Sequence, residues 1–99
     1  MHYFQEKDGE LWAEGLKVKD LATKYGTPLY IYSASTLLRH YQAYDSAFQD
    51  IAHLTCFSAK CNSNLSILKL FKEQGAGVDI VSAGELFKAL KAGIHPSKI

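Results

Sequence analysis

The stretch Cys56-Phe57-Ser58-Ala59-Lys60-Cys61-Asn62 decides the fold class. A short β-like run over residues 51–59 ends there in a lysine, and a helix capped by Ser63 or Asn64 is predicted to follow, closing at residue 75. A second strand over residues 77–81 and a second helix over residues 82–93 come next. Strand and helix therefore alternate with short loops, which is typical of βα units in a parallel sheet. The sequence predicts an α/β fold.

The residues before this stretch have a different organisation. Two short strand-like runs flank Asp8-Gly9, which predicts a hairpin, and a helix over residues 16–26 follows. Residues 29–32 are rich in β-formers and predict a strand after Pro28. Ser33 or Ser35 can then cap a helix that continues to about residue 49.

Composition excludes several classes of protein. A net charge of +1, with 21% charged residues, gives no reason to expect nucleic acid or a membrane as partner, and no apolar stretch is long enough to span a bilayer. The four histidines and two cysteines have no metal-ligand spacing, so we expect no metal. We interpret Cys56 and Cys61 as small buried residues. Without a secretory signal or a disulfide framework, a cytoplasmic location is the default.

Two ionisable residues lie where parallel α/β folds gather their chemistry, at the carboxyl ends of strands. Lys60 ends the first βα strand, and Asp79 lies near the end of the second. If both point to one face, their strand neighbours Phe57, Ala59 and Val78 pack on the helices. Placement alone favours an ordinary interpretation, because a lysine at a strand end usually extends to solvent and an aspartate before a helix is usually a cap.

Three motifs favour a functional role for Lys60 and Asp79 over the ordinary one. Cys56–Asn64, followed by Ile67-Leu68-Lys69-Leu70, resembles the segment YAVKAN-x-N-x-x-(I/V)LKLL of the fold-type III decarboxylases that use pyridoxal phosphate (PLP). Residues 75–86 are similar to GAGFDVVSGGEL of the same family, and residues 25–32 look like YGTPLYVY, the opening typical of its diaminopimelate decarboxylase branch. The three motifs occur in the family's order and span most of the chain.

The resemblance implies a cofactor, a reaction and a set of site residues. Lys60 is expected to hold PLP as a Schiff base, in a partly desolvated site that favours its neutral amine. Asp79 is expected to be an electrostatic partner of Lys60 or of a neighbouring catalytic group. Glu85, Asn62 and Ser82 match further cofactor-binding positions, although the helix dipole alone could explain Glu85. The reaction implied is decarboxylation of meso-diaminopimelate to L-lysine.

The resemblance also implies the domain organisation. Residues 1–32 are expected to belong to a second, mostly β domain, and residues 33–99 to begin the PLP-binding (β/α)8 TIM barrel, which needs about 250 residues. The complete protein is expected to be a homodimer. The chain on its own is predicted to be an inactive N-terminal portion, because the family's phosphate-binding loop and substrate-binding residues lie beyond residue 99.

Three alternatives remain open. The chain could belong to another enzyme of the same fold: an arginine, ornithine or carboxynorspermidine decarboxylase, or an alanine racemase. It could belong to a non-catalytic PLP-binding protein, although the strand segment ahead of the barrel argues against a single-barrel protein. It could also be an inert βα module, which added PLP would not stabilise.

Overall fold

The structure is a computed structural model that describes residues 2–99. Its contacts divide the chain into two compact units, one ending at His40 and one running from Tyr41 to Ile99. The boundary falls within helix α2 (Ala34–Ser46).

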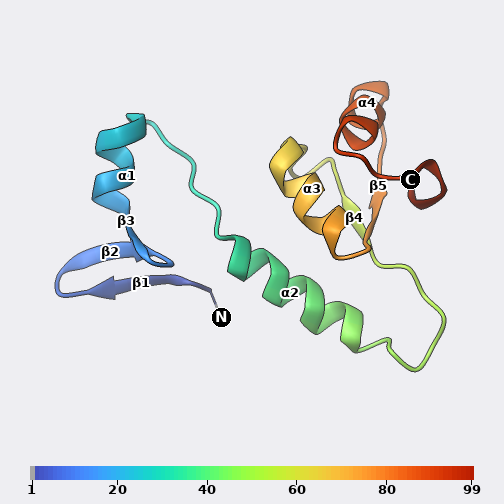
Figure 1. Ribbon diagram of the computed structural model, residues 1–99, viewed down its shortest axis with the longest axis horizontal. Helices are drawn as coiled ribbons and strands as arrows, with labels where there is room; N and C mark the ends of the chain where they lie inside the picture. Colours follow the sequence, from blue (N-terminus) through green and yellow to red (C-terminus); the bar gives the residue numbers. More distant parts are fainter. Residues whose placement is uncertain (1) are drawn as a thin grey trace. The chain divides into compact units, whose positions relative to one another are not determined.

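The first unit contains a small antiparallel sheet of β1 (Phe4–Lys7), β2 (Glu10–Ala13) and β3 (Leu16–Lys17), in that order (Figure 1). Asp8 and Gly9 connect β1 to β2 with φ angles of 53° and 73°. Two consecutive left-handed residues suit a tight hairpin turn, and glycine adopts that conformation without strain. The predicted hairpin is therefore confirmed. Helix α1 (Val18–Tyr25) follows and contacts β2 and β3.

The predicted strand at residues 29–32 is wrong. These residues are irregular, and among residues 2–99 no strand pairs with them. The β-forming residue types are present, but a strand needs a hydrogen-bonded neighbour, which this part of the chain does not supply. Ser33 lies immediately before α2 and caps it, as its hydroxyl accepts a hydrogen bond from the Thr36 amide at 3.0 Å.

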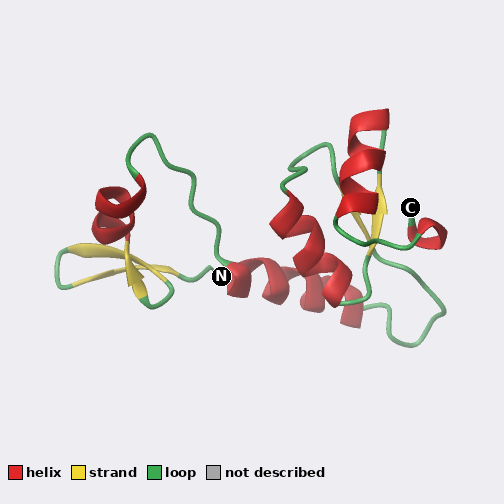
Figure 2. Ribbon diagram, turned by 45° about the horizontal axis from the view of Figure 1, so that its top comes forward, coloured by secondary structure: helices red, strands yellow, loops and turns green. Residues whose placement is uncertain are grey.

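The second unit contains the predicted βα pairs. Strands β4 (Cys56–Ser58) and β5 (Gly77–Asp79) are parallel and lie side by side, and helices α3 (Leu65–Glu73) and α4 (Ala83–Lys91) follow them (Figures 1 and 2). A 3-10 turn, η1 (Pro96–Lys98), comes after α4. The α/β prediction is confirmed in these two strand–helix pairs, β4–α3 and β5–α4.

The elements are shorter than the sequence predicts. Strand β4 has three residues instead of the nine at 51–59, because its partner β5 has only three with which to form a ladder. Helix α2 ends at Ser46 instead of about residue 49. The amides of Ala47, Phe48 and Gln49 bond to carbonyls three residues earlier, so the helix closes in tight turns.

The core of the second unit confirms the predicted alternation along the strands. Its buried members come from the turn after β4 (Ala59), from α3 (Leu68), from β5 (Val78), from α4 (Ala89) and from the segment after α4 (Ile94). Phe57 of β4 and Ile80 pack against them. Helices α3 and α4 do not cover the opposite face of the two-stranded sheet, and Asp79 is exposed there. Cys56 alternates onto that face and is exposed, as is Cys61 in the following turn. The prediction that both thiols are buried is wrong for this reason.

Two features are absent from the described residues, a helix that could span a membrane and a cluster of metal ligands. None of the helices within residues 2–99 is long and apolar enough to cross a membrane. In the same part of the chain, no three His, Cys, Asp or Glu side chains gather as a metal site would require.

Candidate functional site

Lys60 lies in the turn that follows β4, two residues after the last strand residue, Ser58. Its side chain is exposed, and within residues 2–99 neither a hydrogen bond nor an ion pair engages its amine. The expected position at the carboxyl end of the strand is correct. The partial desolvation expected of a cofactor lysine is not present in this chain.

Asp79 is the last residue of β5 and lies directly beside the end of β4. The two strands pair with Ser58 opposite Asp79, and the Ala59 amide donates to the Asp79 carbonyl at 2.9 Å. The structure therefore places Asp79 next to the backbone that leads into Lys60. The Asp79 carboxylate accepts a hydrogen bond from the Ser58 hydroxyl, with Oγ and Oδ2 3.0 Å apart.

Ser82 and Glu85 form the start of α4. The Ser82 hydroxyl accepts from the Glu85 amide at 3.1 Å, and the Glu85 carboxylate accepts from the Val81 amide at 2.7 Å. This reciprocal arrangement closely resembles a capping box, which satisfies amides that the first helical turn leaves free. Both residues thus have a structural role here, and their predicted contact with the cofactor stays a prediction.

Asn62 is half-buried in the loop between Lys60 and α3. Its side-chain oxygen accepts from the Asn64 amide at 3.1 Å, and Asn64 in turn caps α3 by accepting from the amides of Ser66 and Ile67. The two asparagines therefore set the path of the chain from the lysine turn into the helix. Of the two predicted caps, Ser63 and Asn64, the structure uses Asn64.

Sequence reasoning missed Ser58 as a possible site residue. The signal was available in the strand alternation, because Ser58 precedes Lys60 by two residues on a strand whose other face packs on the helices. Its pairing with Asp79 could not be read from the sequence, because that requires the register between two strands 21 residues apart in the chain.

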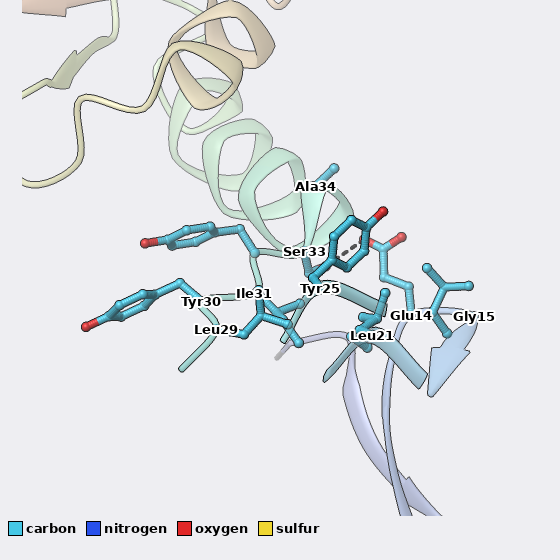
Figure 3. A pocket seen from close by; sticks show the side chains of 12 residues that line it. Glu14, Gly15, Leu21, Tyr25, Leu29, Tyr30, Ile31, Ser33 and Ala34 are labelled. Atoms are coloured by element: carbon cyan, nitrogen blue, oxygen red, sulfur yellow. Dashed lines mark hydrogen bonds between the residues drawn. The ribbon is translucent and has the colours of Figure 1, made fainter. Parts of the chain in front are cut away.

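The first unit contains a separate pocket of about 510 Å³, which includes none of the predicted site residues. Figure 3 shows it between the end of α1, at Leu21 and Tyr25, and the irregular segment at Leu29 and Ile31. At its edge the Ser33 hydroxyl donates to Glu14 Oε1 at 2.7 Å. This bond, with a second from the Ser35 amide, lowers the pKa of the Glu14 carboxyl. The remaining lining is mostly apolar, so the pocket presents little chemistry of its own.

Comparison with protein families finds a match to α2 and the rest of the second unit. Residues 34–99 match the family described as pyridoxal-dependent decarboxylase, pyridoxal binding domain. Over the whole chain, a diaminopimelate decarboxylase of Vibrio cholerae is 51% identical, and one of Aquifex aeolicus is 48% identical over 98% of the chain. The chain spans about a quarter of the length of these relatives, 24% and 23% respectively.

Solved structures give the same result for the fold. A diaminopimelate decarboxylase of M. jannaschii matches 98% of the chain with a TM-score of 0.92 and 33% identity, and the chain covers 24% of it. A diaminopimelate decarboxylase of Helicobacter pylori, solved in complex with L-lysine, matches 82% of the chain with a TM-score of 0.77 and 41% identity, and the chain covers 21% of it. The α/β fold of the chain is therefore that of the N-terminal part of these proteins.

Proposed function

We propose that this chain, because it belongs to the pyridoxal-dependent decarboxylases, provides the cofactor-bearing lysine of an enzyme that converts meso-diaminopimelate to L-lysine. The observation that supports this most directly is Lys60, an amine with no competing partner among the described residues, at the carboxyl end of β4. The relatives named above are diaminopimelate decarboxylases, and that of Helicobacter pylori was solved with L-lysine. These observations favour diaminopimelate over ornithine, arginine or alanine as substrate.

The residues present fit PLP. A primary amine must be free to react with the cofactor's aldehyde, and the Lys60 amine is neither bonded nor buried among residues 2–99. When bound, PLP supplies an electron sink for the pair released as the substrate carboxylate leaves as carbon dioxide. Lys60 would hold the cofactor, and after displacement by the substrate amine its Nζ would move a proton.

Asp79 would act electrostatically. Its carboxylate lies at the end of the strand next to β4, and we propose it as an electrostatic partner of Lys60 or of a neighbouring catalytic group. Asn62 would support the turn that contains Lys60, and Ser82 and Glu85 would hold the start of α4 at the same end of the sheet. We propose these three as supporting cofactor-binding residues.

The test uses the complete polypeptide that contains these residues. We expect it to release carbon dioxide from meso-diaminopimelate and to form L-lysine in the presence of PLP. Borohydride reduction followed by peptide mapping should place the cofactor on Lys60, and Lys60→Ala should reduce turnover to background. Lys69→Arg, a change at an exposed position of α3, is the matched control and should keep full activity.

Other outcomes would contradict the proposal. Turnover of ornithine or arginine without turnover of meso-diaminopimelate would assign the chain to another branch of the family. Absence of label on Lys60 would remove its proposed role. The 99-residue chain by itself should be inactive, because Lys60 and Asp79 are both exposed in it; measurable turnover by that chain would contradict this part of the proposal.

The domain organisation is part of the same proposal. We propose that residues 1–32 pack with a mostly β domain and that residues 33–99 begin a (β/α)8 barrel. In the first unit, the Trp12 indole N–H is buried without an acceptor among the described residues, and Leu11 and Leu16 are exposed. A further protein segment could satisfy the donor and cover the apolar side chains.

The proposed partners and location follow from the family. We propose a homodimer in the complete protein, with a small amino acid as substrate and neither nucleic acid nor a membrane as partner. The near-neutral net charge of +1 supports the absence of nucleic acid. The two exposed free thiols, Cys56 and Cys61, suit the reducing conditions of the cytoplasm.

A further inference from the structure

Ser58 and Asp79 occupy the face of the β4–β5 sheet that the helices do not cover. Phe57 and Ala59, on either side of Ser58, belong to or pack against the core, so Ser58 alternates onto the opposite face. Asp79 is opposite Ser58 in the register of the two strands. Lys60 follows two residues later, so the three residues lie together at the carboxyl end of the sheet.

The Ser58 hydroxyl makes a specific contact with the carboxylate. Its Oγ lies 3.0 Å from Asp79 Oδ2, and since an ionised carboxylate only accepts, the hydroxyl donates. A hydrogen bond of this kind is strengthened by the charge and restricts the rotation of an otherwise exposed side chain.

The contact is not needed to hold the strands together. The Ala59 amide already bonds to the Asp79 carbonyl at 2.9 Å, and the Gly77 amide bonds to the Thr55 carbonyl at 3.0 Å. The hydroxyl adds nothing to this backbone ladder, and its effect is on the direction of the carboxylate.

We propose that Ser58 is a positioning residue, whose hydroxyl holds the Asp79 carboxylate in one rotamer at the end of β4 where Lys60 acts. This inference rests on the proposed function, which assigns Lys60 and Asp79 to the reaction. Ser58 itself would touch neither cofactor nor substrate. It acts only through Asp79.

The first measurement requires no activity. In the cofactor-free polypeptide, the three-bond Hα–Hβ couplings of Asp79 should report a single rotamer. Ser58→Ala should give averaged couplings, and Ser58→Thr, which keeps a hydroxyl, should restore the single rotamer. Ser66→Ala, at an exposed site on α3, is the control and should leave the couplings unchanged.

The second measurement separates positioning from general stability. In the PLP-loaded enzyme, Ser58→Ala should lower kcat about tenfold, as expected for loss of one hydrogen bond to a charged group, with KM changed less than about twofold. Ser58→Thr should keep kcat close to that of the parent. In the Asp79→Asn background, Ser58→Ala should cause no further loss, because the two residues act as one unit.

Several results would overturn the inference. These are averaged Asp79 couplings in the parent protein, a kcat loss from Ser58→Ala that persists in Asp79→Asn, and failure of Ser58→Thr to restore activity. Absence of PLP on Lys60 in the parent would overturn the proposed function and with it the role of Ser58 in the reaction. The couplings would still decide separately whether Ser58 orients the carboxylate.

Discussion

At the scale of single residues, His53 has an unusual set of partners. Its Nδ1 lies 2.8 Å from the Ile51 carbonyl and its Nε2 lies 2.9 Å from Asp45 Oδ1. Both partners only accept, whereas a neutral imidazole has one N–H, so only the doubly protonated ring can donate to both. Thr55 Oγ1 donates to the same carboxylate oxygen at 2.7 Å. The four residues join the end of α2 to the segment that leads into β4.

The protonation states of this pair follow from their contacts. The Ile51 carbonyl, and then the Asp45 carboxylate, raise the pKa of His53 above its ordinary 6.5. The Thr55 hydroxyl, and then His53, lower the pKa of Asp45 below its ordinary 3.8. Tyr41 of α2 also lies near Asp45, and burial followed by the Asp45 charge raises the pKa of its hydroxyl. Both groups of the pair are therefore mostly charged between pH 3.8 and 6.5.

We predict that this pair makes stability depend on pH in two directions. The contribution of His53 is complete below pH 6.5 and is lost as the pH rises through its higher folded pKa. The contribution of Asp45 is complete above pH 3.8 and is lost as the pH falls through its lower folded pKa. Denaturation midpoints measured from below pH 3.8 to well above pH 6.5, with NMR titration of the His53 ring, check both directions. Asp45→Asn should lower the His53 pKa; an unchanged titration would refute the contact.

At the scale of elements, helix α3 depends on its first turn. Asn64 accepts from the amides of Ser66 and Ile67 at 2.9 and 3.4 Å, and these donors would otherwise have no partner within the helix. The helix provides Leu68, a fully buried side chain of the core. The cap therefore stabilises the element that follows the lysine turn.

Replacing this cap should cost a predictable amount of stability. Asn64→Ala is expected to lower the free energy of unfolding by about 1 kcal/mol, as is usual for loss of an N-cap. Asn64→Asp keeps an acceptor and should cost much less. Urea denaturation of the two variants compares them, and equal losses would show that the side-chain hydrogen bond is not the cause.

The pairing of β4 with β5 depends on a glycine. A Cβ added to Gly77 would lie 2.7 Å from Cys56 Sγ and 2.8 Å from the Lys98 carbonyl oxygen. The second contact is with backbone, which cannot move aside as easily as a side chain. Position 77 therefore accepts no larger residue without a shift of the strand or of η1.

We predict that Gly77→Ala destabilises the second unit by roughly 1–3 kcal/mol, the usual cost of overpacking a closely packed site. Gly84→Ala is the matched control, because the nearest atom to an added Cβ there is Ser82 Oγ at 4.0 Å. Thermal unfolding of both variants makes the comparison. Equal stability of Gly77→Ala and the parent would contradict the crowding around Gly77.

At the scale of the whole molecule, much apolar surface is exposed. Tyr30, Val81 and Phe87 are 85%, 69% and 68% exposed, and the largest residues of α4 face away from the core while Ala89 is buried. The β4–β5 sheet has two strands, so both edges present free backbone groups within the described residues. Surfaces of this kind favour association with other protein segments.

We predict that the isolated 99-residue chain associates in solution in a concentration-dependent way, because burying these side chains removes apolar area from water. Sedimentation velocity over a range of concentrations measures this. Phe87→Lys should weaken the association, whereas Lys88→Arg on the same helix should not. A monodisperse monomer at all concentrations would contradict the prediction.

The sequence alone determined the features that depend on local patterns. It predicted the order of strand and helix after residue 51, the hairpin at Asp8-Gly9, the cap at the start of α3 and the position of Lys60 after β4. Apolar periodicity, turn residues and caps act over a few positions, so they can be read from neighbouring residues. The resemblance of three motifs to a family led to the proposed cofactor and reaction, which local physics does not specify.

The tertiary structure decided what depends on distant partners. It left residues 29–32 without a strand neighbour, shortened β4 to the length of β5 and exposed Cys56 on the uncovered face of the sheet. It also brought Ser58 to Asp79 and His53 to Asp45. Strand register and the covering of a face arise from contacts between residues far apart in the chain, and a local pattern is compatible with more than one such arrangement.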